Sequence, residues 1–342
     1  MILHAFTSGF SQVGRSKRLI IFAWILNVAL SFVVVVPLLN TLDGYIGDTV
    51  NEEELLQQIS ANWFATFQAD HRAGDIAANI DLTIFGHAVF YHHTELFLGG
   101  AIVKRIGHFF SDLVFRFRVS TEHIDLLLML TLLYDLLWIF LAGGFISLFA
   151  RNQAGSISEF LSEGARYVGP FLRLSLLAVL IFFLLFIIVV DPITRLISSW
   201  TEREASELTP FVYYMIRNIW VALMLAFLSM STDYAKIRIV VDDRSSALVA
   251  YGAGMWFALR HLSHTGGLYI LLTLIGFILI SLYAIAESQI PQSGYTTILL
   301  MFIIQQIYVV MRLCLKTGFF ATQTNLYNAI SRQEHASLAR SG

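Results

Sequence analysis

Two stretches of this sequence repeat one pattern: Ser158-Glu-Phe-Leu-Ser-Glu-Gly-Ala-Arg-Tyr-Val-Gly-Pro-Phe-Leu-Arg173 and Ser246-Ala-Leu-Val-Ala-Tyr-Gly-Ala-Gly-Met-Trp-Phe-Ala-Leu-Arg260. In each, a serine is followed by Gly-Ala and then by an arginine that opens or precedes a long apolar run. The repetition predicts a duplicated membrane unit, in which a surface helix turns into a membrane-spanning helix.

The composition indicates that lipid is the main solvent of this surface. The chain has 342 residues, of which 57% are hydrophobic and only 13% are charged, whereas about 25% of the residues of a soluble domain are charged. The lipid bilayer is therefore the expected partner. A net charge of −2 gives no reason to expect binding to nucleic acid. The single cysteine, Cys314, excludes an internal disulfide and a cysteine-based metal site.

Six apolar runs have the length of about 20 residues that crossing the hydrocarbon core requires. We therefore predict an all-α fold, a polytopic membrane helix bundle of about six transmembrane helices with a duplicated span–amphipathic elbow–span unit. The predicted spans are 19–39, 123–149, 171–190, 211–232, 266–286 and 295–316.

Lysine and arginine gather in alternate loops, and such loops are cytoplasmic in most membrane proteins. The loop 191–210 on the other side carries more acidic than basic residues. Both termini are therefore expected in the cytoplasm. The predicted parts are a cytoplasmic N-terminus with the first span (1–39), an extracytoplasmic amphipathic helical cap (40–122), a five-helix transmembrane core with two cytoplasmic elbow helices (123–316), and a cytoplasmic tail (317–342).

Within the cap, the stretch 81–103 is nearly apolar enough to be a seventh span. It also holds five ionisable residues, which would be costly in hydrocarbon, and a seventh crossing would put the later basic loops on the wrong side. We therefore predict a helical cap lying on the membrane, and the sequence leaves open whether 81–103 is interfacial or re-entrant. The five residues are Asp81, His87, His92, His93 and Glu95.

The two repeated stretches are predicted to be elbow helices. Ser156 and Glu159 form the capping-box pattern of a helix start, and small residues allow another backbone to approach closely. The elbows are either ordinary packing elements or docking sites for a cytoplasmic partner or a lipid. The candidate docking residues are Gly164, Ala165, Arg173, Gly252, Ala253 and Arg260.

A resemblance to known proteins rests on two segments. The first is Phe140-Leu-Ala-Gly-Gly-Phe-Ile-Ser-Leu-Phe149 together with Ser158 to Tyr167. The second is Asp233-Tyr-Ala-Lys-Ile-Arg-Ile-Val-Val-Asp-Asp-Arg-Ser-Ser-Ala-Leu248. They resemble a widespread group of six-span bacterial inner-membrane proteins without an assigned activity. That group is distantly similar to the membrane domain attached to some glycerophosphodiester phosphodiesterases. The resemblance covers roughly residues 120–325. It implies a bacterial inner-membrane location and a duplicated helical fold, and it brings no catalytic residues.

Histidines cluster in the cap, and His87, His92, His93 and Glu95 are the candidate ligands there. His92 and Glu95 are three residues apart and share a helix face, as a metal or porphyrin ligand set would require. His87 lies five residues before His92, off that face, and no recognised ligand pattern is present. Histidines at headgroup depth are therefore the favoured interpretation, and no metal or cofactor is expected.

Ionisable residues inside spans are functional candidates because burying them in lipid is costly. Asp135 lies inside the second span and Arg217 inside the fourth, at comparable depths from the outer face. We predict that the two side chains pair, and that the pair either holds the bundle together or lines a polar path.

Three classes of function follow from the sequence. The favoured one is a non-catalytic membrane protein, an accessory or structural subunit that packs in a larger membrane assembly or organises lipid. The alternative is a transporter or permease for a small or lipidic substrate, which the duplicated unit suits. The third, a lipid enzyme using the cap histidines, is least favoured because no catalytic motif is found.

Overall fold

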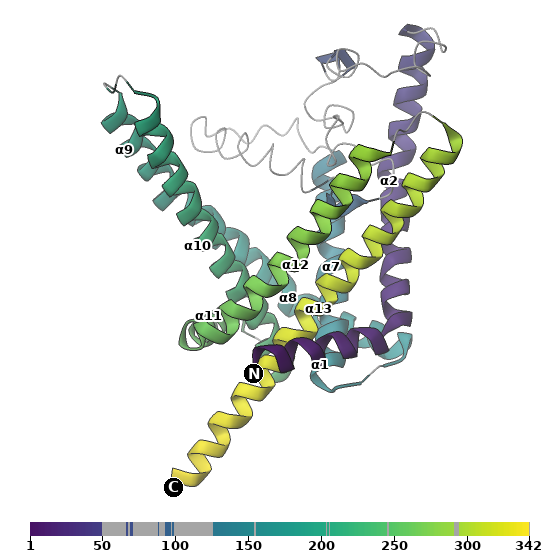
Figure 1. The fold of residues 1–342 in the computed structure, drawn as a ribbon. Helices are drawn as coiled ribbons and strands as arrows, with labels where there is room; N and C mark the ends of the chain where they lie inside the picture. Colours follow the sequence, from purple (N-terminus) through teal and green to yellow (C-terminus); the bar gives the residue numbers. More distant parts are fainter. Residues whose placement is uncertain are drawn as a thin grey trace. The chain divides into compact units, whose positions relative to one another are not determined.

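The structure is a computed structural model that describes residues 1–49, 66–67, 69–70, 88, 93–96, 98, 126–153, 155–202, 204, 206–244, 246–290 and 294–341. Every regular element within these residues is a helix, which confirms the predicted all-α class (Figure 1). The elements are α1 (Ile2–Arg15), α2 (Lys17–Thr49), α7 (Leu126–Ala150), α8 (Ile157–Leu185), the π-helical turn η4 (Phe186–Val190), α9 (Asp191–Thr201), α10 (Leu208–Val241), α11 (Ala247–Arg260), α12 (Leu262–Gln289) and α13 (Tyr295–Ser341).

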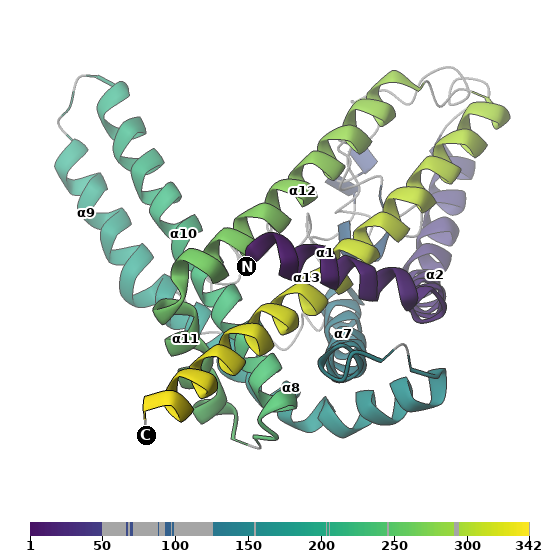
Figure 2. The same cartoon turned by 60° about the horizontal axis from the view of Figure 1, so that its bottom comes forward.

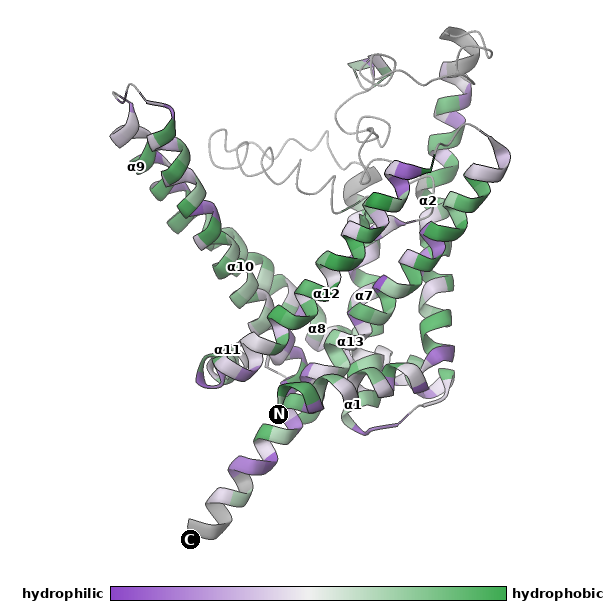
Figure 3. Cartoon of the chain, in the orientation of Figure 1, coloured by the Kyte–Doolittle hydropathy of each residue, from purple (hydrophilic) through white to green (hydrophobic). Residues whose placement is uncertain are grey.

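Six helical stretches in the described part of the chain are long and apolar enough to cross a membrane, as predicted. The protein is therefore a multi-pass membrane protein. In Figure 3, α10 and α12 are hydrophobic along most of their length. The six stretches are Lys17–Tyr45, Met129–Ala150, Ile157–Thr201, Leu208–Val241, Leu262–Gln289 and Tyr295–Glu334.

The third stretch is longer than its predicted span of 171–190. The first elbow is continuous with it, since α8 begins at Ile157, and the helix continues through η4 and α9 to Thr201. Much of the predicted loop 191–210 is therefore helical. Pro192 cannot donate a hydrogen bond and would crowd the carbonyl four residues earlier; the wider π turn just before it relieves this clash.

The two predicted elbows begin in the same way, which supports the duplicated unit. After α7, the Gln153 amide donates to the Leu148 carbonyl, and after α10 the Arg244 amide donates to the Ile239 carbonyl. These bonds span five residues, as in a Schellman helix end, and the preceding residues, Asn152 and Asp243, have positive φ. A serine then occupies the N-cap position of the elbow helix in each case, Ser156 for α8 and Ser246 for α11. Only the Ser156 side chain makes the capping hydrogen bond, and its predicted capping box with Glu159 is confirmed.

Each elbow then packs closely on the span before it through glycine. A Cβ at Gly164 would lie 3.0 Å from the Phe140 carbonyl oxygen of α7, so this prediction of close approach is confirmed. No described atom of the chain lies within 4 Å of the Cβ position of Gly252, so a close approach there stays a prediction. The contact falls on Gly254, whose Cβ would lie 2.6 Å from the Ala235 nitrogen of α10. The two-residue step between them turns the helix by about 200°, which puts Gly252 on the exposed side of α11.

By its internal contacts the chain forms two compact units. The first comprises Met1–Ser16, Ile139–Thr273 and Thr317–Gly342, and the second comprises Lys17–Trp138 and Leu274–Lys316. In the first unit, α1 packs on the end of α13, where Gly318 faces the Phe10 ring and Asn325 donates to Ser8 and Gln12. The last part of α13 is thus anchored in that unit.

Candidate functional site

The candidate site lies in the second unit, on one face of α13. Gln305, Tyr308, Arg312 and Lys316 follow one another at intervals of three or four residues, so their side chains share a helix face. Gln305 is fully buried, and the neighbouring Gln306 accepts a hydrogen bond from the Trp24 indole. A span helix thus carries two cations and a buried amide in line.

Glu95 supplies the negative charge of this site. Its Oε1 lies 3.5 Å from Arg312 Nη2 and 3.6 Å from Lys316 Nζ, and its Oε2 accepts a hydrogen bond of 3.0 Å from the Tyr134 hydroxyl of α7. Lys316 also lies over the Trp138 ring, 3.6 Å from its centroid. The donors therefore come from two span helices, whereas the carboxylate comes from a separate short segment.

This short segment, residues 93–96, contacts α7 and α13 several turns after the first residue of each helix. Tyr134 lies about 12 Å along α7 from Leu126, and Arg312 about 26 Å along α13 from Tyr295, at a rise of about 1.5 Å per residue. The hydrocarbon core is about 30 Å thick. Counted from Tyr295, Arg312 therefore lies towards the far side of such a core, within a span helix but away from its start.

The surroundings fix the charge of both ionisable residues in the segment. Burial raises the pKa of the Glu95 carboxyl, but the positive charges of Lys316 and Arg312 outweigh it and bring the pKa to about 2. Burial lowers the pKa of the His93 imidazole to about 4, although the Glu95 carboxylate opposes this. Neither residue belongs to a membrane-spanning helix. At neutral pH Glu95 is thus charged and His93 neutral.

These shifts predict a loss of stability in mild acid. Because the pKa of His93 is about 4 in the folded chain and ordinarily 6.5, the unfolded chain binds the proton first, and stability falls as the pH drops from about 6.5 towards 4. The contribution of the ionised Glu95 carboxylate to the stability of the fold is lost only at lower pH, because its pKa is about 2. His93→Phe keeps a ring against Tyr308 and should flatten the dependence of the melting temperature in detergent between about pH 7.5 and pH 5.

The control for this measurement is His4→Asn, which alters an exposed histidine and should leave the pH dependence of the native protein intact. An equal fall in melting temperature for His93→Phe and the native protein would mean that His93 does not cause it.

The structure gives a mixed outcome for the four predicted ligands. His87 and His92 lie outside the described residues, and Glu95 pairs with cations. The His93 ring packs edge-on against Tyr308, with centroids 5.4 Å apart, and within the described part of the chain its Nδ1 has no hydrogen-bond partner. Among the described residues, no group of three histidine, cysteine or acidic side chains could hold a metal ion.

Asp135 and Arg217 belong to different units, and their pairing stays a prediction. Within its own unit, Arg217 donates 2.7 Å hydrogen bonds to Thr194 and Asn218 and lies over the Tyr214 ring.

A double-mutant cycle tests the pairing. Asp135→Ala alone should destabilise the protein by leaving a guanidinium without its carboxylate, whereas Asp135→Ala combined with Arg217→Ala should cost much less than the two single changes summed. Melting temperatures in detergent give the three values. Additive losses would show that the pair does not exist.

The elbow candidates divide into buried and exposed residues. Gly164 is buried in the helix contact, while Ala165, Arg173, Gly252 and Arg260 are exposed and Ala253 is half-buried. Arg260 lies 3.5 Å from the Glu334 carboxylate of α13, and the Ala253 carbonyl accepts from Arg238. The exposed residues remain candidates for docking.

Sequence reasoning missed the partners of Glu95. Arg312 and Lys316 lie near the end of the predicted sixth span, 295–316, and Tyr134 lies inside the predicted second span, 123–149. The available signal was the four-residue spacing of the two cations within one span, which implies a buried acid opposite them. Nothing in the sequence indicated that residue 95 would supply it.

In the part of the chain that the structure describes, the fold is that of a multi-pass helical membrane protein with six candidate spans. No protein-family model, curated protein or solved structure matches the chain.

Proposed function

We propose that the protein is a non-catalytic membrane subunit that packs against a partner in a larger membrane assembly. The observation behind this proposal is a helical hairpin, residues 186–222, formed by η4, α9 and the first part of α10. In both Figure 1 and Figure 2, α9 lies beside α10. Ile197 is the single buried residue among those that the structure describes in this hairpin.

The two span helices that contribute to the hairpin are the least buried of the six, followed by Leu262–Gln289 at 17%. In the most apolar 18 residues of Ile157–Thr201 only 11% are buried, and in those of Leu208–Val241 only 6% are buried. The corresponding share for Met129–Ala150 is 67%. Membrane helices associate through packing and interhelical hydrogen bonds, and a hairpin with so few internal contacts is free to make them with another protein.

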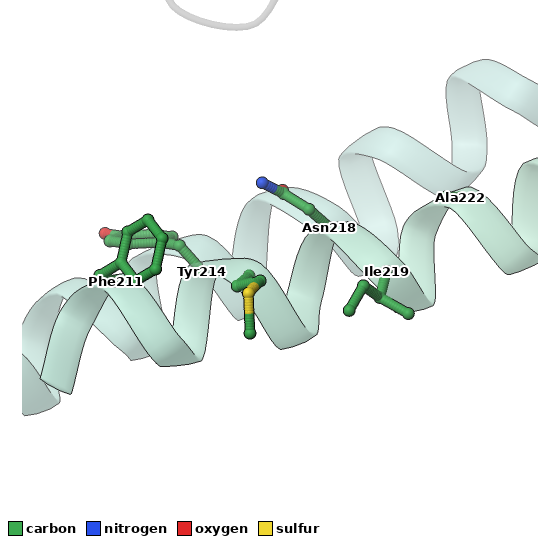
Figure 4. A pocket seen from close by; sticks show the side chains of 6 residues that line it. Phe211, Tyr214, Asn218, Ile219 and Ala222 are labelled. Carbon is green, nitrogen blue, oxygen red and sulfur yellow. The ribbon is translucent and has the colours of Figure 1, made fainter. Parts of the chain in front are cut away.

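Polar groups on the hairpin favour a protein partner over lipid alone. Two contacts tie α9 to α10, Arg217 to Thr194 at 2.7 Å and Ser198 to Tyr214 at 2.9 Å. Beside them Asn218 is exposed, and a polar amide facing lipid is costly. Figure 4 shows Phe211, Tyr214, Asn218 and Ile219 on successive turns of α10, where they line a shallow hollow that would receive a partner's side chains.

The proposed setting is the bacterial inner membrane, with both termini in the cytoplasm. The distribution of lysine and arginine between the loops supports this orientation, and the resemblance to six-span bacterial membrane proteins supports the location. Labelling of cysteines introduced at Thr7 and at Ser206, after Cys314→Ser, would test it: only the second should react with an impermeant reagent in intact cells.

A crosslinking experiment tests the subunit proposal. A photoreactive residue at Ile219, in the hollow, should capture one membrane protein in stoichiometric amounts in native membranes, identified by mass spectrometry after gentle extraction. The matched control is the same residue at Ile278 of α12, which is similarly exposed, at 56% against 55%, and should capture lipid. Capture of lipid alone at both positions would overturn the proposal.

A second candidate, a permease-like protein for a small or lipidic substrate, is favoured by the Glu95 cluster. Ionisable residues inside a membrane bundle commonly mark substrate or ion pathways, and the duplicated elbows suit the internal repeats of transporters. Uptake by vesicles containing only this protein, lost on Arg312→Gln, would replace the subunit proposal by this one.

A further inference from the structure

The donors around Glu95 have the composition of an oxyanion site. A guanidinium (Arg312), an ammonium (Lys316) and a phenol hydroxyl (Tyr134) converge on the two oxygens of one carboxylate. Arginine and lysine are the residues that most often bind carboxylate and phosphate groups. All three donors project from the parts of the span helices α7 and α13 that belong to the second unit.

The carboxylate that fills this site is held loosely. Its distances to the two cations are 3.5 Å and 3.6 Å, whereas strong charge-assisted bonds are about 2.7–2.9 Å long. The Arg312 side chain is 38% exposed and that of Lys316 is 27% exposed. A competing anion can therefore reach both cations without first opening the bundle.

Further polar atoms beside the site are buried without partners. His93 Nδ1, Thr94 Oγ1 and both amide atoms of Gln305 have no hydrogen-bond partner among the residues that the structure describes, and His93 and Thr94 are 2% and 3% exposed. Gln305 lies on the same face of α13 as the two cations. Buried polar atoms without partners are costly, so they mark where a ligand's other polar groups, or its water, would be bound.

We propose that Arg312, Lys316 and Tyr134 form an anion-binding site whose built-in occupant is the Glu95 carboxylate, and that a carboxylate or phosphate oxyanion competes with it. Glu95 is carried by a segment outside the span helices, so the chain can exchange its own carboxylate for the ligand while the donors stay in place. The ligand is either a free anion or the phosphate of a lipid headgroup, since both present the same oxygens. This site goes beyond the proposed subunit role and does not depend on the hairpin.

The test uses the full chain in neutral detergent. Inorganic phosphate, acetate and dispersed phosphatidylglycerol are titrated while the melting temperature and the heat of binding are recorded, with sodium chloride at equal ionic strength as reference. Glu95→Gln removes the competing charge at nearly constant size, so we expect its affinity for at least one of the three probes to rise tenfold or more over the native protein. Adding Arg312→Gln to that variant should abolish this binding.

The control is Arg166→Gln, which removes an arginine from an exposed pair with Asp243 in the other unit and should leave the affinity unchanged. If Glu95→Gln is unstable in chloride, phosphate or the lipid should restore its melting temperature, and Glu95→Asp, with a shorter carboxylate, should show a smaller gain in affinity. Binding of phosphate or acetate supports the site with a free anion, and binding of phosphatidylglycerol alone supports it with a lipid headgroup. Unchanged affinity in both Glu95 variants, or full binding after Arg312→Gln, would overturn the proposal.

Discussion

Gly254→Ala is expected to destabilise the protein by about 2 kcal/mol or more, the cost of overpacking a close contact. The added Cβ would lie 2.6 Å from the Ala235 nitrogen, 2.9 Å from its Cα and 2.9 Å from the Ser231 carbonyl oxygen. All three are backbone atoms of α10, so no side chain can rotate to make room. The elbow α11 would have to move away from the span, and the melting temperature in detergent would report the loss.

The same helix offers a matched control two residues away. Gly252→Ala adds its Cβ into open space and gains helix propensity, so it should raise stability by up to about 1 kcal/mol. The two variants carry the same chemical change and differ only in the side of α11 that receives it. Equal effects of the two substitutions would show that α11 does not pack on α10 through Gly254.

Glu95→Gln is expected to destabilise the protein by about 3 kcal/mol in a buffer without phosphate or other oxyanions, because removing one partner of a buried ion pair leaves charges uncompensated. Glu95 is about one-fifth exposed, and the carboxylate is shared by Arg312, Lys316 and Tyr134. The double variant, with both Glu95→Gln and Arg312→Gln, should lose less stability than the two single variants summed. Chemical unfolding monitored by tryptophan fluorescence would measure both.

An exposed ion pair provides the comparison. Asp243→Asn breaks the 3.2 Å pair with Arg166, in which the Asp243 side chain is 75% exposed, and such surface pairs contribute at most about 1 kcal/mol. If Glu95→Gln were no more harmful than Asp243→Asn, the Glu95 cluster would not stabilise the bundle.

The fold was largely predictable because its strongest determinants are local. Apolar run length locates six spans, and Ser156 with Glu159 locates the start of α8 through hydrogen bonds within one turn. Where the prediction failed, a longer-range geometry was responsible. The predicted third span ends at residue 190, but a π turn before Pro192 lets the helix continue, and only the three-dimensional crossing of α11 with α10 selects Gly254 over Gly252.

The candidate site was less predictable, since its parts are far apart in the chain. Glu95 was noted as a ligand beside histidines, and its contacts with Arg312 and Lys316 join residues more than two hundred positions apart. Hydropathy and spacing report which face of a helix is apolar, and they do not report which loop residue reaches that face. The intramembrane pair of Asp135 and Arg217 is a prediction of the same kind and awaits its double-mutant cycle.

The π turn at Phe186–Val190 also sets the phase of α9. An α-helix advances about 100° per residue, so one residue more or fewer in this turn would rotate Asp191–Thr201 by that angle about its axis. Thr194 and Ser198, which now meet Arg217 and Tyr214, would then turn away from α10. The hairpin is therefore sensitive to chain length at this point: a single-residue deletion here should uncouple the two helices even if every side chain on them is kept.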